Sequence, residues 1–131
     1  MPRSGSDSLT PREAQIMAVL WDSAPATAEQ IREALPDRPH DSTVRTLLRV
    51  LEEKGYVRHT ARGKAYEYRP AVARARIERK ALRSVLKRFF GGSAEALVLR
   101  LIEDEEITPE QLAQLQRKPE SRRKDILPGG M

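Results

Sequence analysis

The side chains best suited to chemistry in this 131-residue chain are hydroxyl and guanidinium groups on one predicted helix. Val44, Leu47, Leu48 and Leu51 recur at the spacing of a single helical face, which predicts an amphipathic helix over 42–54. The opposite side then carries Ser42, Arg45, Thr46 and Arg49, and Thr43 lies at its flank. Arginine can bond O6 and N7 of guanine with two parallel donors, and threonine offers a hydroxyl and a methyl group, so this face suits base edges in the major groove of DNA. We expect Arg49, one turn further along, to contact a phosphate.

A second group of basic residues lies in a predicted β-hairpin. Residues 56–60 and 65–69 are β-branched or aromatic runs, and residues 61–64 between them include a glycine. Arg62 and Lys64 should therefore lie at the hairpin tip, where they can straddle the DNA backbone or enter the minor groove. Taken singly, the helix face can be a solvated surface and the tip an ordinary turn. Their joint occurrence after two other helices favours DNA binding.

No arrangement typical of an enzyme or a metal site accompanies these residues. The chain has no cysteine, which excludes disulfides, thiolate metal sites and thiol nucleophiles. His40, Asp41 and Ser42 are adjacent, whereas a base and its orienting group must converge from different directions, so we interpret Asp41 or Ser42 as a helix cap. His40 and His59 lack a third ligand at metal spacing. We therefore expect no catalytic residue, no metal and no cofactor.

The helices that must position the polar face begin with two capping boxes. The sequence Thr-Pro-Arg-Glu at 10–13 predicts a helix that runs to about Asp22. The sequence Thr-Ala-Glu-Gln at 27–30 predicts a short helix that ends near Leu35. Gly55 stands where the helix over 42–54 needs a left-handed residue at its end. Three helices followed by a hairpin are typical of a winged helix-turn-helix domain.

Residues 71–117 are predicted to be helical and to present more apolar surface than so short a segment can bury. Gly91 and Gly92 separate the first two of these helices, and a third begins after Thr108. A second copy of the chain can cover the surface, so we predict dimerisation through eight residues: Leu82, Val85, Leu86, Phe89, Leu97, Val98, Leu101 and Ile102. The alternative is that these helices fold back on residues 1–70 of the same chain.

Positive charge is concentrated in the middle of the chain. The whole chain has 24 Lys+Arg and 19 Asp+Glu, but residues 71–90 hold seven basic residues and one acid, and residues 42–69 hold seven against three. Concentrated positive charge is typical of proteins that bind polyanions, although a solvated surface also produces it by chance. The charge pattern alone does not decide between the two.

These elements predict a mainly α fold with a small β-hairpin, arranged in four segments. The segments are a disordered N-terminal tail (1–8), a winged helix-turn-helix DNA-binding domain (9–70), a helical dimerisation domain (71–117) and a disordered C-terminal tail (118–131). No run of eighteen apolar residues predicts a transmembrane helix, and the first eight residues lack the apolar stretch of a signal peptide. We expect a cytoplasmic protein with no membrane partner.

Several of these motifs together resemble the penicillinase repressor (BlaI/MecI/CopY) family. The likeness covers about residues 9–117 and rests on five stretches: 9–21, 42–47 with Leu51, 53–56, 66–68, and Gly91-Gly92 with 97–99. The resemblance implies a homodimeric winged-helix repressor that binds a dyad-symmetric operator in double-stranded DNA through its third helix and dimerises through its C-terminal helices. The family's base-contacting positions correspond to Ser42, Thr43, Arg45 and Thr46; some relatives have a lysine where this chain has Ser42.

The resemblance also bears on regulation. Family members of the antibiotic-resistance branch are inactivated by proteolysis at an Asn-Phe bond. The matching bond here is Arg100–Leu101, which makes it the candidate proteolytic site and a regulatory protease a candidate partner, although susceptibility to the same protease does not carry over. The copper-responsive branch uses C-terminal cysteines, which this chain lacks, so metal sensing by thiolates is excluded.

Two other functions compete with sequence-specific repression. A winged helix can serve as a protein-interaction module, and a basic domain can bind DNA architecturally, without sequence preference. The arginine and hydroxyl face over 42–49, beside a basic hairpin, favours DNA over protein docking, because docking does not require it. A repressor should prefer its operator to random DNA by at least ~10³, whereas an architectural protein should not.

Overall fold

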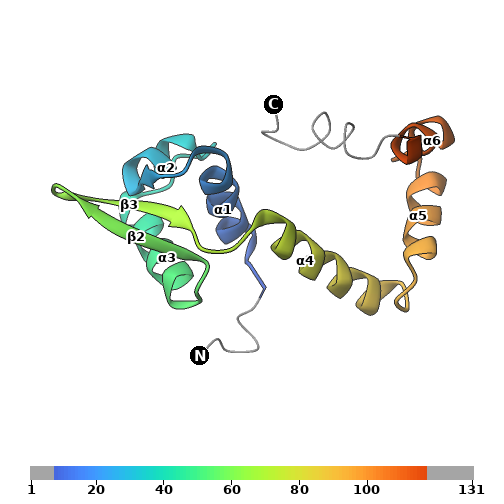
Figure 1. Cartoon of the computed structure of the whole chain (residues 1–131), viewed down its shortest axis with the longest axis horizontal. Helices are drawn as coiled ribbons and strands as arrows, with labels where there is room; N and C mark the ends of the chain where they lie inside the picture. The colour runs from blue at the N-terminus through green and yellow to red at the C-terminus, as the bar shows by residue number, and fades with distance from the viewer. Residues whose placement is uncertain (1–7, 118–131) are drawn as a thin grey trace. The chain divides into compact units, whose positions relative to one another are not determined.

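The computed structural model describes residues 8–117, which contain six helices and a three-stranded antiparallel sheet (Figure 1). The helices are α1 (Pro11–Ser23), α2 (Ala28–Ala34), α3 (Asp41–Glu53), α4 (Arg74–Phe89), α5 (Ala94–Glu103) and α6 (Pro109–Arg117). The strands are β1 (Ala26–Thr27), β2 (Val57–Arg62) and β3 (Ala65–Pro70). The predicted mainly α fold with a hairpin is confirmed. The predicted tails, 1–8 and 118–131, lie outside the described residues except for Ser8.

The chain divides within α4, between Ile77 and Glu78, into two units. The first unit holds α1, α2, α3 and the sheet, and the second holds most of α4 with α5 and α6. The sequence predicted a boundary at 70/71, where the hairpin ends. The first turn of α4 instead belongs to the first unit, because Val72 and Ile77 pack against its core and Trp21 Nε1 donates to the carbonyl oxygen of Val72 at 3.0 Å.

As predicted, α1, α2 and α6 each begin with a pair of reciprocal hydrogen bonds between side chains and backbone amides. In α1, the Glu13 amide donates to Thr10 Oγ1 at 3.1 Å, and the Thr10 amide donates to Glu13 Oε1 at 2.8 Å. Thr27 and Gln30 repeat this capping box at α2, and Thr108 and Gln111 repeat it at α6. Each box satisfies amides that the first helical turn cannot pair internally, which fixes where the helix starts.

The sheet has one strand that the sequence analysis did not predict. The strand order is β1-β3-β2, and β1 pairs with β3 through Ala26 opposite Tyr68 and Thr27 opposite Glu67. Two residues are too short to show an alternating pattern, and their pairing depends on the free edge of β3. The hairpin therefore joins the helices through β1, which lies directly before α2.

The core of the first unit is built from all of its elements. Helix α3 contributes Val44, Leu48 and Leu51, each fully buried. The other buried apolar residues are Ile16, Met17 and Leu20 of α1, Ala26 of β1, Ala28 and Ile31 of α2, Leu35, Tyr56, Val57 and Tyr68. The predicted periodicity of α3 is confirmed, except that Leu47 is only partly buried at the edge of this core.

A buried ion pair joins the start of α1 to the end of α3. Lys54 Nζ donates to both carboxylate oxygens of Glu13 at 3.0 Å, and the side chains are 12% and 3% exposed. Burial alone would raise the pKa of Glu13, but the hydrogen bonds from Thr10 and the ammonium group of Lys54 outweigh it and lower the pKa below its ordinary value. The resulting stabilisation is present above the ordinary carboxyl pKa and is lost as the pH falls through the lower folded pKa.

The second unit buries much less. None of α4, α5 and α6 contains a buried residue, in contrast to α1, α2 and α3. Ser93 caps α5 as predicted, its hydroxyl accepting from the Ala96 amide at 3.0 Å. None of the helices within residues 8–117 combines the length and the apolar character needed to span a bilayer.

Removing one partner of the buried ion pair should strongly destabilise the first unit. We expect Lys54→Met to lower the free energy of unfolding by about 3 kcal/mol at pH 7, because it leaves the Glu13 carboxylate buried without its counter-ion. Urea denaturation followed through Trp21, the sole tryptophan, measures the change. Asp37→Asn is the control: it removes an exposed ion pair with Arg12 and should have a much smaller effect, since solvent screens that pair. Equal losses in both variants would contradict the expectation.

Candidate nucleic-acid interface

The start of α3 is held differently from the prediction. The N-cap is His40, whose Nδ1 accepts from the Ser42 amide at 3.1 Å, whereas the sequence analysis assigned the cap to Asp41 or Ser42. Asp41 is the first residue of the helix, and its carboxylate instead accepts from Arg45 Nε at 2.7 Å. The same ring nitrogen also lies 2.9 Å from the Ser42 hydroxyl. The structure thus leaves Asp41 to position Arg45.

The polar residues predicted for one face of α3 and its flank are all exposed: Ser42, Thr43, Arg45, Thr46 and Arg49. They are exposed because the opposite face of the same helix is buried in the core. The hydrogen bond to Asp41 raises the pKa of Arg45 above its ordinary value, so this side chain is fully charged. The bond uses Nε, which leaves the four N–H groups of the two Nη atoms for another acceptor.

The hairpin turns more tightly than predicted. Arg62 is the last residue of β2 and lies opposite Ala65, so the loop is only Gly63 and Lys64 rather than 61–64. Gly63 has a φ of +62°, a conformation that glycine adopts without strain and that two-residue hairpin loops require. The Arg62 side chain is 79% exposed, and its guanidinium group lies 3.9 Å from the Glu67 carboxylate. Two basic side chains therefore flank the glycine of the tip.

A groove of about 250 Å³ lies between the start of α2, α3 and the tip of the hairpin. Of the predicted site residues, Arg45 and Lys64 line it together, with Thr27, Ala28, Glu29, Ala65, Tyr66 and Tyr68. The structure thus brings one helix residue and one hairpin residue to the same hollow. The other polar residues of α3, with Arg62, lie outside it.

A contact that the sequence analysis missed ties α3 to the hairpin. His59 Nδ1 lies 2.8 Å from both carboxylate oxygens of Glu52, and the imidazole stacks on the Tyr66 ring with centroids 4.3 Å apart. The sequence analysis considered His59 only as a metal ligand and assigned it no partner. The available signal was position: His59 follows Glu52 by seven positions, across the turn at Gly55. The contact links the end of α3 to the strand that carries Arg62.

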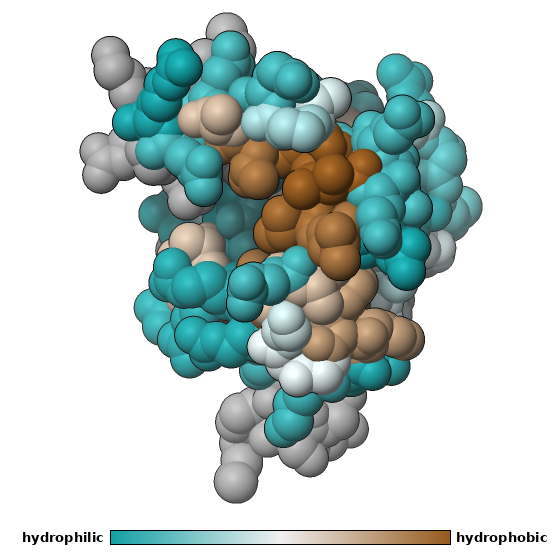
Figure 2. All heavy atoms as spheres, turned by 90° about the vertical axis from the view of Figure 1, so that its right-hand side faces the viewer, coloured by the Kyte–Doolittle hydropathy of each residue, from teal (hydrophilic) through white to brown (hydrophobic). Residues whose placement is uncertain are grey.

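The residues predicted for dimerisation lie on the second unit and are accessible. Leu82, Val85 and Phe89 of α4 are exposed, Phe89 to 70%, and Leu86, Leu97, Val98, Leu101 and Ile102 are half-buried. Figure 2 shows apolar side chains gathered into one patch with polar residues around it, on the side of the molecule that carries α5 and α6. Contiguous apolar patches of this kind are typical of interaction surfaces.

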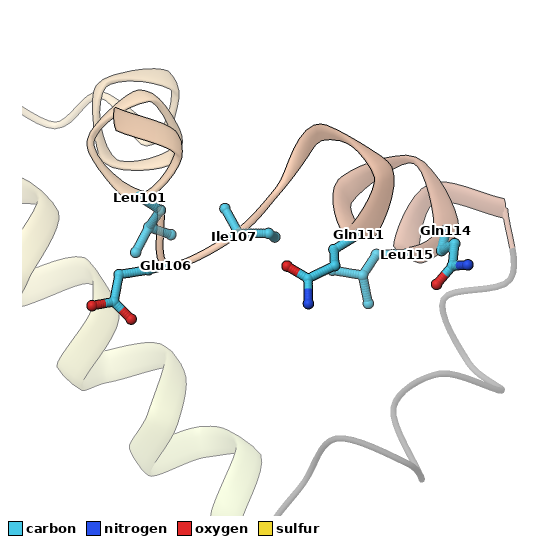
Figure 3. A pocket seen from close by; sticks show the side chains of 6 residues that line it. All are labelled: Leu101, Glu106, Ile107, Gln111, Gln114 and Leu115. Atoms are coloured by element: carbon cyan, nitrogen blue, oxygen red, sulfur yellow. The ribbon is translucent and has the colours of Figure 1, made fainter. Parts of the chain in front are cut away.

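A hollow of about 340 Å³ lies between α5 and α6 in the same unit. Its wall includes Leu101 on α5, Ile107 on the connecting segment and Leu115 on α6, with Glu106, Gln111 and Gln114 (Figure 3). The apolar members make it suited to a side chain from another molecule. The Arg100–Leu101 bond, the predicted proteolytic site, lies within helix α5, and Arg100 pairs with Glu103 at 3.5 Å. It is therefore not in the exposed loop tips where proteolytic nicking concentrates.

Within residues 8–117, no group of three or more His, Asp or Glu side chains lies close enough to hold a metal ion. Both histidines instead have structural partners: His40 caps α3, and His59 contacts Glu52. The chemistry that these residues offer is hydrogen bonding and charge, from exposed hydroxyls and guanidinium groups.

Comparison with known proteins gives a consistent result. The sequence pattern of the family described as "Penicillinase repressor" matches residues 9–120. The chain is 26% identical over 105 residues to the methicillin resistance regulatory protein MecI of Staphylococcus aureus (strain N315), a match that covers 79% of this chain and 85% of the relative. It is 25% identical over 105 residues to the penicillinase repressor of Bacillus licheniformis, covering 79% of this chain and 82% of the relative. The names of these relatives describe regulators and not enzymes.

Proposed function

The chain belongs to the penicillinase repressor family, and from this premise we propose that it is a homodimeric, sequence-specific DNA-binding repressor of transcription that acts in the cytoplasm. The names of its relatives, a methicillin resistance regulatory protein and a penicillinase repressor, support the repressor role. The observation that carries the proposal is the exposed face of α3, which combines two arginines with three hydroxyl residues beside a basic hairpin tip.

In the proposed complex, α3 enters the major groove of the operator. An α-helix fits this groove, and the residues near its N-terminus reach the base edges. Arg45, oriented by Asp41, supplies the two-donor fork that suits guanine, with Ser42, Thr43 and Thr46 as further base contacts. Arg49 and the hairpin residues Arg62 and Lys64 contact phosphates, which fix the position of the helix and supply most of the affinity.

In a dimer, two α3 helices contact the same DNA. A second copy that covers the apolar surface of α4 and α5 places two α3 helices in successive major grooves, about 34 Å apart or a multiple of that, on an operator with dyad symmetry. Linking two modules raises the effective concentration of the second one once the first has bound. Any event that opens the second unit, including cleavage by a regulatory protease, would then release DNA without altering α3.

The direct test is selection of bound fragments from the source genome by the full chain, followed by measurement of affinity for the selected duplex and for random DNA. We expect the ratio of the two affinities to be at least ~10³ at physiological salt. Similar affinity for all duplexes would favour an architectural DNA-binding protein. No binding to any duplex would overturn the proposal and favour a protein-interaction module.

The role of Arg45 can be tested by separating its charge from its geometry. Arg45→Ala should weaken binding to the selected operator by roughly 1–3 kcal/mol and relax specificity at one base pair. Arg45→Lys keeps the charge but loses the fork, so it should lose affinity for the operator while retaining affinity for random DNA. Fluorescence anisotropy with labelled duplexes measures both. Equal weakening on operator and random DNA would identify Arg45 as a phosphate contact only.

Lys64 should act through charge alone. Lys64→Ala should weaken binding to all sequences alike and reduce the slope of log affinity against log salt by about one per bound protomer. Arg69→Ala, near the end of β3 that lies away from the tip, is the matched control and should leave the slope unchanged. Titrations at four or five salt concentrations give the slopes. A slope that Lys64→Ala does not change would remove the hairpin tip from the interface.

One side of α5 forms part of the proposed dimer surface. Leu101→Asp places a carboxylate in that surface and should yield monomers in sedimentation velocity experiments. Leu99→Asp is the matched control, because Leu99 lies on the other side of the same helix, where it is 55% exposed, and its substitution should leave the dimer intact. Circular dichroism verifies that both variants are helical. A dimeric Leu101→Asp variant would contradict the placement of the interface.

A further inference from the structure

Helix α4 carries a second charged surface that the proposed interface does not use. Plotted at 100° per residue, four exposed basic residues fall within about 100° of one another on one side of the helix. We call these residues the α4 basic stripe: Arg79, Lys80, Arg83 and Lys87. They span about 12 Å of helix. The apolar side chains Leu82, Val85 and Phe89 lie on the adjoining side.

Few of the ion pairs among residues 8–117 involve the stripe. Several arginines on other helices have carboxylate partners, namely Arg12 with Asp37, Arg32 with Glu29, Arg45 with Asp41, and Arg100 with Glu103, although Arg49 of α3 has none within the same residues. Arg79, Arg83 and Lys87 also form no ion pair within the part of the chain that the structure describes. The single acid of α4, Glu78, lies towards the apolar side of the helix, between the positions of Val85 and Phe89.

Unpaired charges of the same sign at this spacing destabilise the helix. Arg79 and Arg83 are four residues apart, as are Arg83 and Lys87, and such pairs repel across one turn. A solvated helix face usually mixes both signs, which gives pairs that attract. A ligand with closely spaced negative charges would remove the repulsion. The arrangement therefore suits contact with a polyanion better than exposure to solvent.

We propose that the α4 basic stripe binds the phosphate backbone of duplex DNA, as a contact without sequence preference that adds to the base contacts of α3. The inference rests on the proposed function, since it takes the same DNA as the ligand. Duplex DNA carries one negative charge per about 1.7 Å of its axis, so a 12 Å run of cations meets several phosphates. Arginine and lysine are the side chains that supply such contacts.

The alternative polyanion is a membrane surface rich in anionic lipids, which also binds basic amphipathic helices. Membrane binding would need the adjoining apolar side of α4, and the proposed function assigns Leu82, Val85 and Phe89 to the second copy of the chain. The helix is also attached to the DNA-binding unit at its first turn, where Arg74 lies 3.6 Å from Asp22 and its guanidinium stacks over Trp21. The proposed dimer and the attachment of α4 to the first unit both favour DNA over a membrane.

The test uses the full chain with Arg79→Gln and Arg83→Gln combined. We expect the salt slope of DNA binding to fall by about two for each bound protomer, because each lost phosphate contact removes about 0.9 from it. Affinity for the operator and for random DNA should fall by the same factor, roughly tenfold or more at moderate salt. Arg79→Lys combined with Arg83→Lys should retain the slope, because the contact depends on charge.

The matched control combines Arg100→Gln and Arg117→Gln, which remove the same charge from α5 and α6 and should leave the slope unchanged. An unchanged slope in the stripe variant, with wild-type protein still binding its operator, overturns this inference and leaves the proposed function intact. Wild-type protein that binds no duplex overturns both. Stripe-dependent binding to phosphatidylserine vesicles, with no change in the DNA slope, assigns the surface to membranes and also overturns the inference. Circular dichroism confirms that the compared variants are equally helical.

Discussion

The rotation of α3 about its own axis is set by the burial of Val44, Leu48 and Leu51, which are all fully inaccessible to solvent. Burying side chains of this size contributes roughly 2 kcal/mol each, so any rotation that exposed them would be strongly disfavoured. The hydroxyl and arginine residues lie on the other side of the same cylinder and have no freedom to turn inwards. Packing of the core thus determines which residues of α3 are exposed, and they are already exposed when no ligand is bound.

The two units differ in how much of their apolar surface they bury. In the first, two contacts fix the C-terminal end of α3: the buried Glu13–Lys54 pair links it to α1, and Glu52 links it to the hairpin through His59. In the second, no helix has a buried residue, and large apolar side chains such as Phe89 remain accessible. The first unit buries its own core, whereas the second leaves apolar side chains accessible, and these form the surface that the proposed second copy of the chain would cover. In that proposal, association of the second unit can be regulated with no change in the first.

Most of the fold follows from local signals in the sequence. Capping boxes at Thr10 and Thr27 and the glycine at 55 predicted the helix limits well, because the groups that satisfy a helix end lie within four residues of it. Strand β1 was missed, since its pairing with β3 joins segments some forty residues apart. The contact between Glu52 and His59 was missed for a related reason: it appears only once the turn between helix and hairpin has brought them together. The polar face of α3 was predicted correctly as exposed, but the roles of its residues depend on a partner that the chain alone does not contain.

The pairing register of the hairpin restricts how relatives of this chain can diverge. Side chains alternate between the two faces of a strand, so a residue inserted within β2 or β3 would exchange the faces of everything beyond it in that strand. His59 and Tyr66, which stack on the same face, would then no longer meet. Residues 62 and 64 lie at the hairpin tip, where a substitution leaves this register unchanged. Variation in charge at constant strand length is therefore the pattern to expect where such proteins adapt to new binding sites.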